Sequence, residues 1–192
     1  MRCREALPPR ARAVALVLMD VDGVLTDGGI TFIEGNREAR TYDARDGVGL
    51  WLARRGGLRT GLISGRSSAA VTRRAAELRI DEVHQRIEDK LQAYLGILRR
   101  RRLTDAQICY IGDDLNDLPI LLRVGMPVAV ADAHAEVRRR VPFVTHAPGG
   151  RGAVREVIDA VLKVQGRWEG LLRQFAPADL PRTGGRRGRA GA

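Results

Sequence analysis

The run Ala13-Val-Ala-Leu-Val-Leu-Met19, followed at once by Asp20-Val-Asp22-Gly23, decides the fold class of this chain. Apolar residues without polar alternation are typical of a strand covered on both faces, as in a parallel sheet. The run ends in two aspartates and an Asp-Gly turn signal. Because ligands bind at the carboxyl ends of strands in open α/β sheets, these aspartates are placed where chemistry takes place.

Outward from this strand, β-like and helical segments alternate. Residues 58–63, 82–84, 108–111, 127–130 and 143–145 predict further strands, and the segments after them have helical patterns. Two short β-like runs around a Gly/Asn turn, 30–33 and 39–42, predict a hairpin. Repeated β–α units predict an α/β fold, a Rossmann-like parallel sheet flanked by helices. The segment from Asp27 to Ser64 is too short for a separate cap domain, so we expect a capless fold with a hairpin insertion.

The composition predicts one domain with basic ends. Of the 192 residues, 44% are hydrophobic and 29% charged, and the formal net charge is +10. Seven of the ten excess charges lie in residues 1–12 and 166–192, which are also rich in Pro, Gly and Ala. We therefore expect a flexible basic N-terminus over 1–12, a domain over 13–165 and a flexible Arg/Gly-rich tail over 166–192.

Charge, hydropathy and cysteine content limit the possible partners. Because most of the excess charge lies on the ends, a nucleic-acid partner is expected only for those ends, if at all. No segment approaches the roughly 20 apolar residues of a membrane span. Two cysteines, Cys3 and Cys109, are too few for a disulfide framework. We expect a cytoplasmic protein without a membrane partner.

Polar groups gather where three predicted strands end and where one helix starts. Each group alone is a weak signal, since turns and helix caps use the same residues. Together, several carboxylates need a cation to stay ionised, and oxygen ligands suit Mg²⁺. A hydroxyl, backbone N–H groups and a lysine are donors for a phosphate, and one aspartate can attack phosphorus while another transfers protons. The groups are Asp20/Asp22, Ser64-Gly65-Arg66, Asp113/Asp114 and Lys90, one of only two lysines beside 31 arginines.

In order and spacing, these segments resemble the haloacid dehalogenase superfamily of phosphatases. The matching motifs are residues 20–27, Ser64-Gly-Arg66, Lys90 and residues 112–117. The resemblance implies that Asp20 is the nucleophile and Asp22 the general acid/base. It implies that Ser64, Gly65 and Lys90 bind the phosphoryl group. It further implies that Mg²⁺ is bound by Asp20, the backbone carbonyl of Asp22 and Asp113. Asp114 and Asp117 are then supporting carboxylates.

Over residues 13–165, a closer resemblance is to the 3-deoxy-D-manno-octulosonate 8-phosphate phosphatases. It is carried by residues 20–28 with the hairpin, and by residues 43–50, 64–67 and 148–156. It implies a Mg²⁺-dependent phosphomonoester hydrolase that acts through an aspartyl-phosphate and makes a lipopolysaccharide precursor. It also implies a homotetramer in which the hairpins meet at the centre and a neighbouring subunit helps to close each active site.

Further residues are candidates for binding the sugar acid. Arg66 is suited to pairing with a carboxylate, and a surface ion pair explains it equally well. Asp46-Gly47 resembles a family loop at the mouth of the site and also fits a helix N-cap. The Pro-Gly-Gly-Arg-Gly segment at 148–152 fits either a mobile closing loop or an ordinary flexible one.

Three other functions stay open at this point. The same chemistry on a nine-carbon sialic-acid-type 9-phosphate, or on another sugar phosphate, uses the same motifs. A catalytically silent tetramerisation module keeps the fold, but the intact set Asp20, Asp22, Lys90 and Asp113 argues against it. A response-regulator receiver domain has its phosphorylated aspartate on a separate later strand, which fits this order of motifs less well.

Overall fold

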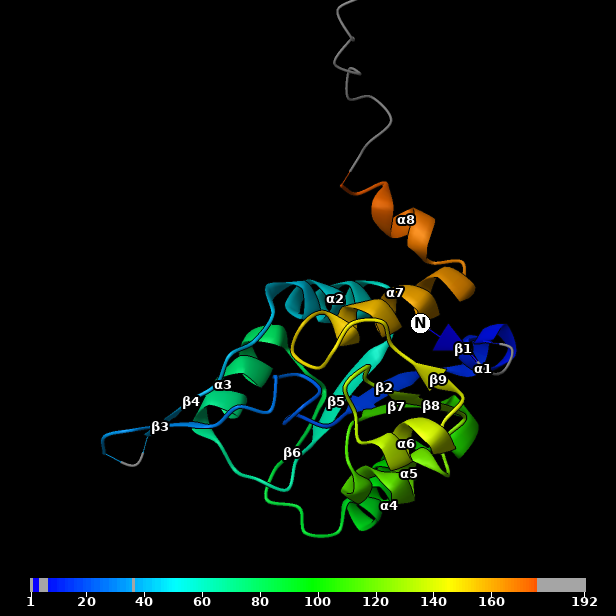
Figure 1. The fold of residues 1–192 in the computed structure, drawn as a ribbon. Coiled ribbons are helices and arrows are strands. Elements are labelled where there is room, and N and C mark those ends of the chain that lie inside the picture. The colour runs from blue at the N-terminus through cyan, green and yellow to red at the C-terminus, as the bar shows by residue number, and fades with distance from the viewer. Residues whose placement is uncertain (1, 4–6, 36, 176–192) are drawn as a thin grey trace, which may run out of the picture.

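The fold is built on a seven-stranded sheet with helices on both faces. The computed structural model describes residues 2–3, 7–35 and 37–175 (Figure 1). Within them the strand order is β1-β9-β8-β7-β2-β5-β6, parallel throughout except for β1, which pairs antiparallel with β9. The strands are β1 (Arg2–Cys3), β2 (Leu16–Met19), β5 (Arg59–Ile63), β6 (Glu82–His84), β7 (Ile108–Gly112), β8 (Met126–Ala129) and β9 (Phe143–Val144).

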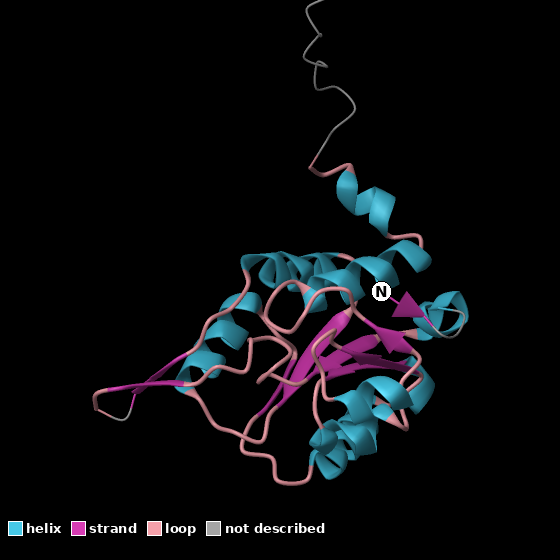
Figure 2. Cartoon of the chain, viewed as in Figure 1, coloured by secondary structure: helices cyan, strands magenta, loops and turns pink. Residues whose placement is uncertain are grey.

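Helices cover the sheet as the β–α alternation predicts. Helices α2 (Ala44–Arg55) and α7 (Ala153–Val164) pack side by side on one face, and α4, α5 and α6 lie on the other (Figures 1 and 2). The remaining helices are α1 (Leu7–Ala13), α3 (Ala69–Leu78), α4 (Lys90–Arg101), η1 (Asp105–Gln107), η2 (Leu115–Asp117), α5 (Leu118–Leu121), α6 (Ala135–Arg140) and α8 (Trp168–Leu172). None of the helices in the described part of the chain combines the length and hydrophobicity of a membrane-spanning segment.

The central strand β2 fixes where the site lies. All four of its residues are completely buried, which explains the uninterrupted apolar run. Its register pairs Met19 with Leu62 of β5 on one side and with Ile111 of β7 on the other. The three strands therefore end level with one another, and the residues that follow them meet at one edge of the sheet.

The predicted hairpin insertion is present, but its second strand is Arg37–Ala39 and does not continue through the predicted residues 39–42. Strands β3 (Thr31–Ile33) and β4 (Arg37–Ala39) form a separate antiparallel pair that projects away from the main sheet (Figure 2). Its apolar side chains face solvent, and Phe32 is 75% exposed. The base of the hairpin lies close to the edge where the strands end, since Arg40, directly after β4, forms an ion pair with Asp22.

The predicted domain limits differ from the structure at both ends. Residues 2–3 form β1 and residues 7–13 form α1, which buries Ala11, so part of the expected flexible N-terminus belongs to the fold. Two prolines near the start of α1 made the segment look unstructured, but proline is tolerated in the first helical turn. At the other end, α8 buries Leu171. Residues 176–192 of the expected tail lie outside the described residues.

Candidate active site

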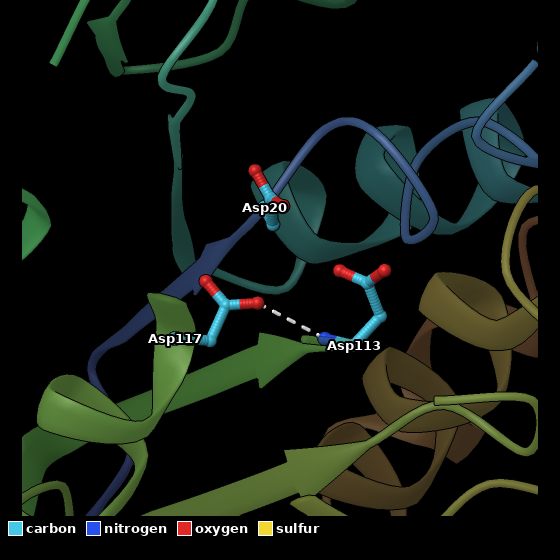
Figure 3. Close-up of side chains that lie close together, drawn as sticks. All are labelled: Asp20, Asp113 and Asp117. Carbon is cyan, nitrogen blue, oxygen red and sulfur yellow. Dashed lines mark hydrogen bonds between the residues drawn. The ribbon is translucent and has the colours of Figure 1, made fainter. Parts of the chain in front are cut away.

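Three aspartates meet at the carboxyl edge of the sheet. Asp20 follows β2, Asp113 follows β7, and Asp117 ends η2 (Figure 3). One carboxylate oxygen from each lies within 4.8 Å of the others. The backbone N–H of Asp113 donates to Asp117 Oδ2 at 3.0 Å, which ties the end of β7 to η2. The sequence predicted that Asp20 and Asp113 converge, because each directly follows one of two neighbouring strands that end level, and η2 brings Asp117 back to the same place.

Lys90 supplies the positive charge of the cluster. It is the first residue of α4, whose start is fixed by Asp89 accepting a hydrogen bond from the Gln92 N–H. Its Nζ lies 3.0 Å from Asp20 Oδ1 and 2.8 Å from Asp117 Oδ1. Burial by itself lowers the pKa of Lys90, but the two carboxylates outweigh burial and raise the pKa. The side chain is therefore a buried ammonium group.

Asp117 supports the site. Its Oδ1 accepts from Lys90 and, at 2.7 Å, from the Tyr110 hydroxyl. Its Oδ2 accepts from the backbone N–H groups of Asp113 and Asp114. With both oxygens occupied and no exposed surface, Asp117 fits the supporting role predicted for it better than that of a metal ligand. Asp114, the other predicted support, is exposed and caps η2 by accepting from the Leu115 N–H.

The cluster carries more negative than positive charge. Burial and the neighbouring Asp117 raise the pKa of Asp20 to about 6, against the opposing effect of Lys90. Burial, with Asp20 and Asp117, raises the pKa of Asp113 to about 8. Asp113 Oδ1 is buried and has no hydrogen-bond partner among the described residues. An unpartnered carboxylate oxygen beside two other carboxylates fits a hard divalent cation such as Mg²⁺.

A small cavity opens in front of these groups. Its volume is about 220 Å³. The predicted phosphate-binding turn reaches it through Gly65, while Ser64 is buried at the end of β5 and its Oγ accepts from the Arg66 N–H at 3.1 Å. The exposed Arg66 guanidinium stands at the rim. The cavity is lined by Asp20, Asp22, Gly65, Arg66, Lys90, Asp113, Asp114 and Asn116.

Asp46 and Gly47, predicted to bind the sugar acid, lie elsewhere. Asp46 is completely buried in α2, and its carboxylate accepts from the N–H groups of Gly152 at 3.1 Å and Arg155 at 2.8 Å. It caps the start of α7, and Asp43 caps α2 itself. Both predicted functions, substrate contact and N-cap of its own helix, are therefore corrected. The partner of Asp46 lies more than 100 residues along the chain, so local sequence could not reveal it.

The Gly-rich segment at 148–152 is packed against the loop that follows β2 and carries Asp22. The Gly149 N–H donates to Asp132, and the Gly150 N–H donates to the Val24 carbonyl at 2.9 Å. A Cβ on Gly149 would lie 1.8 Å from the Gly23 carbonyl oxygen, so only glycine permits this approach. In this structure the segment braces the loop that carries Asp22.

Two charged residues of the hairpin, absent from the sequence predictions, also reach the site. The Arg40 side chain has no exposed surface and forms an ion pair with Asp22, and its Nε is 3.4 Å from Glu38 Oε1. Glu38 Oε2 in turn lies 3.5 Å from Arg66 Nη2. Charged residues next to a turn are ordinarily solvent-exposed, so the sequence carries no signal for this burial.

Comparisons with known proteins show the family of this chain. A family model described as haloacid dehalogenase-like hydrolase matches residues 79–158. The chain is 40% identical over 158 residues to the 3-deoxy-D-manno-octulosonate 8-phosphate phosphatase of Salmonella typhi, covering 82% of this chain and 84% of that protein. It is 40% identical over 161 residues to the phosphatase of the same name from Yersinia pestis, covering 84% and 86%.

Solved structures show the same similarity. The Yersinia pestis phosphatase superposes with a TM-score of 0.84 at 39% identity, covering 85% of this chain and 89% of that one. The 3-deoxy-D-manno-octulosonate 8-phosphate phosphatase of Moraxella catarrhalis, solved with a magnesium ion, a phosphate ion and KDO, superposes with a TM-score of 0.85 at 36% identity. That match covers 88% of this chain and 97% of the other.

Proposed function

The chain belongs to the haloacid dehalogenase-like hydrolase family, and from this membership we propose that it hydrolyses 3-deoxy-D-manno-octulosonate 8-phosphate to the free sugar acid and phosphate. The observation that carries the proposal is the set of buried Asp20, buried Lys90 and half-buried Asp113 in a chain with this degree of identity to phosphatases of that substrate. Hydrolysis of this ester supplies the sugar acid for lipopolysaccharide precursors.

The reaction divides between two aspartates. An Asp20 oxygen attacks phosphorus, the bond from phosphorus to the sugar oxygen breaks, and the proton of Asp22 passes to that oxygen. Asp22 then accepts a proton from water as the water oxygen attacks phosphorus, and the bond to Asp20 breaks to release phosphate. Lys90, held between Asp20 and Asp117, stabilises negative charge on the phosphoryl oxygens together with the Gly65 turn.

The donor set fits Mg²⁺. Asp20, the Asp22 carbonyl and Asp113 would hold the ion, and Asp113 has the unpartnered oxygen. When bound, the ion supplies positive charge next to the phosphoryl oxygens. At the other end of the cavity, the exposed Arg66 is placed to pair with the substrate carboxylate.

The proposal also includes assembly and location. The chain acts as a cytoplasmic homotetramer in which hairpins meet and a neighbouring subunit helps to close each site. The supporting observation is the apolar surface of the hairpin, where Ile30, Phe32 and Ile33 are exposed. The mass of the purified protein in solution tests the assembly, since a monomer contradicts it.

Phosphate release from a panel of sugar phosphates tests the activity. We expect the highest kcat/KM on 3-deoxy-D-manno-octulosonate 8-phosphate with Mg²⁺. Asp20→Asn and Asp22→Asn should each lower kcat by about 1000-fold or more, because each removes a group that acts on the reacting atoms. Glu34→Gln, an exposed acid on the hairpin, is the matched control. A preference for a nine-carbon 9-phosphate rejects the substrate, and full activity of Asp20→Asn rejects the mechanism.

A further inference from the structure

The end of the hairpin places one buried arginine, Arg40, against the loop that carries Asp22. Arg40 follows β4, and its guanidinium contacts Asp22 through an ion pair while its side chain has no exposed surface. A buried guanidinium is costly unless carboxylates compensate it, and here Asp22 and Glu38 do so. Burial also lowers the pKa of Arg40, with Arg66 adding to the effect. Nothing in the proposed chemical steps uses this arginine, so its burial needs another reason.

Glu38 extends the contact to the rim of the cavity. Its Oε1 faces Arg40 and its Oε2 faces Arg66, at 3.4 and 3.5 Å. The side chain of Glu38 is only 14% exposed and that of Asp22 only 22% exposed. Charges shielded to this extent interact more strongly than surface pairs do. Alternating charges thus run from Asp22 through Arg40 and Glu38 to Arg66.

We propose that Arg40 is a positioning residue that aims the Asp22 carboxyl group at the leaving-group oxygen, and that Glu38 links this arrangement to Arg66. The inference rests on the proposed phosphatase function. Arg40 contacts Asp22 Oδ1, which fixes the rotation of the carboxyl group and leaves the second oxygen for proton transfer. A catalytic group displaced by about 1 Å can lose roughly 100-fold in rate, so this restraint has a measurable consequence.

The consequence is a dependence on the leaving group. An alkyl alcohol leaves poorly and needs the proton of Asp22, whereas 4-nitrophenolate leaves well without it. Loss of Arg40 should therefore slow cleavage of the sugar phosphate far more than the first step on 4-nitrophenyl phosphate. A residue that merely stabilises the fold slows both substrates equally.

The test uses Arg40→Met in the full chain with Mg²⁺. We expect kcat on 3-deoxy-D-manno-octulosonate 8-phosphate to fall about 10- to 100-fold while KM changes less than about threefold. The burst of 4-nitrophenol in the first turnover should stay within about threefold of the unsubstituted protein. Arg40→Lys should restore part of the loss. Arg37→Ala is the control, since Arg37 lies exposed on the same hairpin and donates to the Glu34 carbonyl.

Two further measurements keep the outcome decisive. Glu38→Gln should raise KM through Arg66, and an unchanged KM rejects the link. Equal losses on both substrates for Arg40→Met, or activity matching that of Arg37→Ala, reject the positioning role, and Arg40→Lys gives the same comparison if Arg40→Met does not fold. If the protein hydrolyses 4-nitrophenyl phosphate but not the sugar phosphate, the substrate assignment fails. Phenyl phosphate, with its poorer leaving group, then replaces the sugar phosphate in the Arg40 comparison.

Discussion

The sheet edge and the β3–β4 hairpin both lie next to the loop that carries Asp22, yet they are built in opposite ways. At the sheet edge, charged groups such as Asp20, Lys90 and Asp117 are buried and compensate one another within one chain. On the hairpin, apolar groups such as Phe32 are exposed. The difference shows that the ion pairs of the charged centre form within a single chain, whereas the hairpin has apolar surface that a single chain leaves uncovered.

Removing the cation at the sheet edge should have the largest effect. In Lys90→Met, the two buried carboxylates of Asp20 and Asp117 lose the lysine that pairs with both, so kcat should fall about 100-fold or more. The free energy of unfolding should fall by about 3 kcal/mol, because a buried pair loses one member. Urea unfolding and phosphate release measure the two effects. Lys163→Met, the other lysine of the chain and exposed on α7, should change neither. Equal effects of the two substitutions would contradict the buried-charge interpretation.

The same cluster predicts a pH dependence that changes with the metal. Since the pKa values of Asp20 and Asp113 are raised to about 6 and about 8, the folded state holds protons that the unfolded state releases near pH 3.8. Without metal, the stability from this cluster is present at low pH and is lost as the pH rises through these values. Mg²⁺ binds the ionised carboxylates, so its stabilising effect should be larger at pH 8 than at pH 6.

Thermal unfolding with EDTA and with Mg²⁺ at the two pH values measures this difference. Asp113→Asn should lose most of the Mg²⁺ effect, because it removes the proposed ligand with the higher pKa. Glu34→Gln on the hairpin should keep the effect in full. An equal increase in Tm from Mg²⁺ at pH 6 and pH 8 is the outcome that contradicts the prediction.

Alanine substitutions at two glycines, one beside the sheet edge and one on the hairpin, should have smaller effects on the free energy of unfolding. A Cβ on Gly149 would lie 1.8 Å from the Gly23 carbonyl oxygen, so Gly149→Ala should lower the free energy of unfolding by about 2 to 3 kcal/mol and disturb the loop of Asp22. Gly35, at the hairpin turn, has φ +77° and no atom within 4 Å of its Cβ position. Gly35→Ala should therefore cost only about 1 kcal/mol, from backbone strain. Urea unfolding separates the two, and equal losses show that the brace does not restrict the loop.

The sheet edge was predictable because its signals are local. An apolar run followed by acidic residues predicts both a strand and the end of that strand at which ligands bind. The parallel register of β2, β5 and β7 then brings Asp20, Ser64 and Asp113 to one edge of the sheet. Lys90 stood out because the chain has only one other lysine beside 31 arginines. The fold class and the hairpin followed from the same alternation of segments. The start of β2 did not, since Ala13 continues the apolar run but ends α1.

The remaining features depend on partners that are distant in sequence. Asp46 resembles a cap for its own helix and caps α7 instead, because the packing of α2 against α7 decides which N–H groups it meets. The contact of Arg40 with Asp22 depends on how the end of the hairpin packs against the loop that carries Asp22. Composition also misjudged α1 and α8, whose buried residues Ala11 and Leu171 contribute to the core. Such pairings are set by tertiary packing, and no local sequence pattern identifies the residues involved.

The smallest effect on stability should come from the hairpin surface. Phe32 is 75% exposed, so Phe32→Ser removes almost no packing within one chain and should change the free energy of unfolding of that chain by less than about 0.5 kcal/mol. If the hairpins pack together in a homotetramer, the same substitution leaves no cavity inside the subunit. It instead removes apolar surface from the contact between hairpins of different subunits. The mass in solution, measured by light scattering, should then fall below that of the unsubstituted protein.

Phe143→Ser, inside the sheet, is the opposite case. The Phe143 side chain is completely buried, so its loss should unfold the subunit itself. An unchanged mass for Phe32→Ser shows that the exposed hairpin face is not part of the assembly.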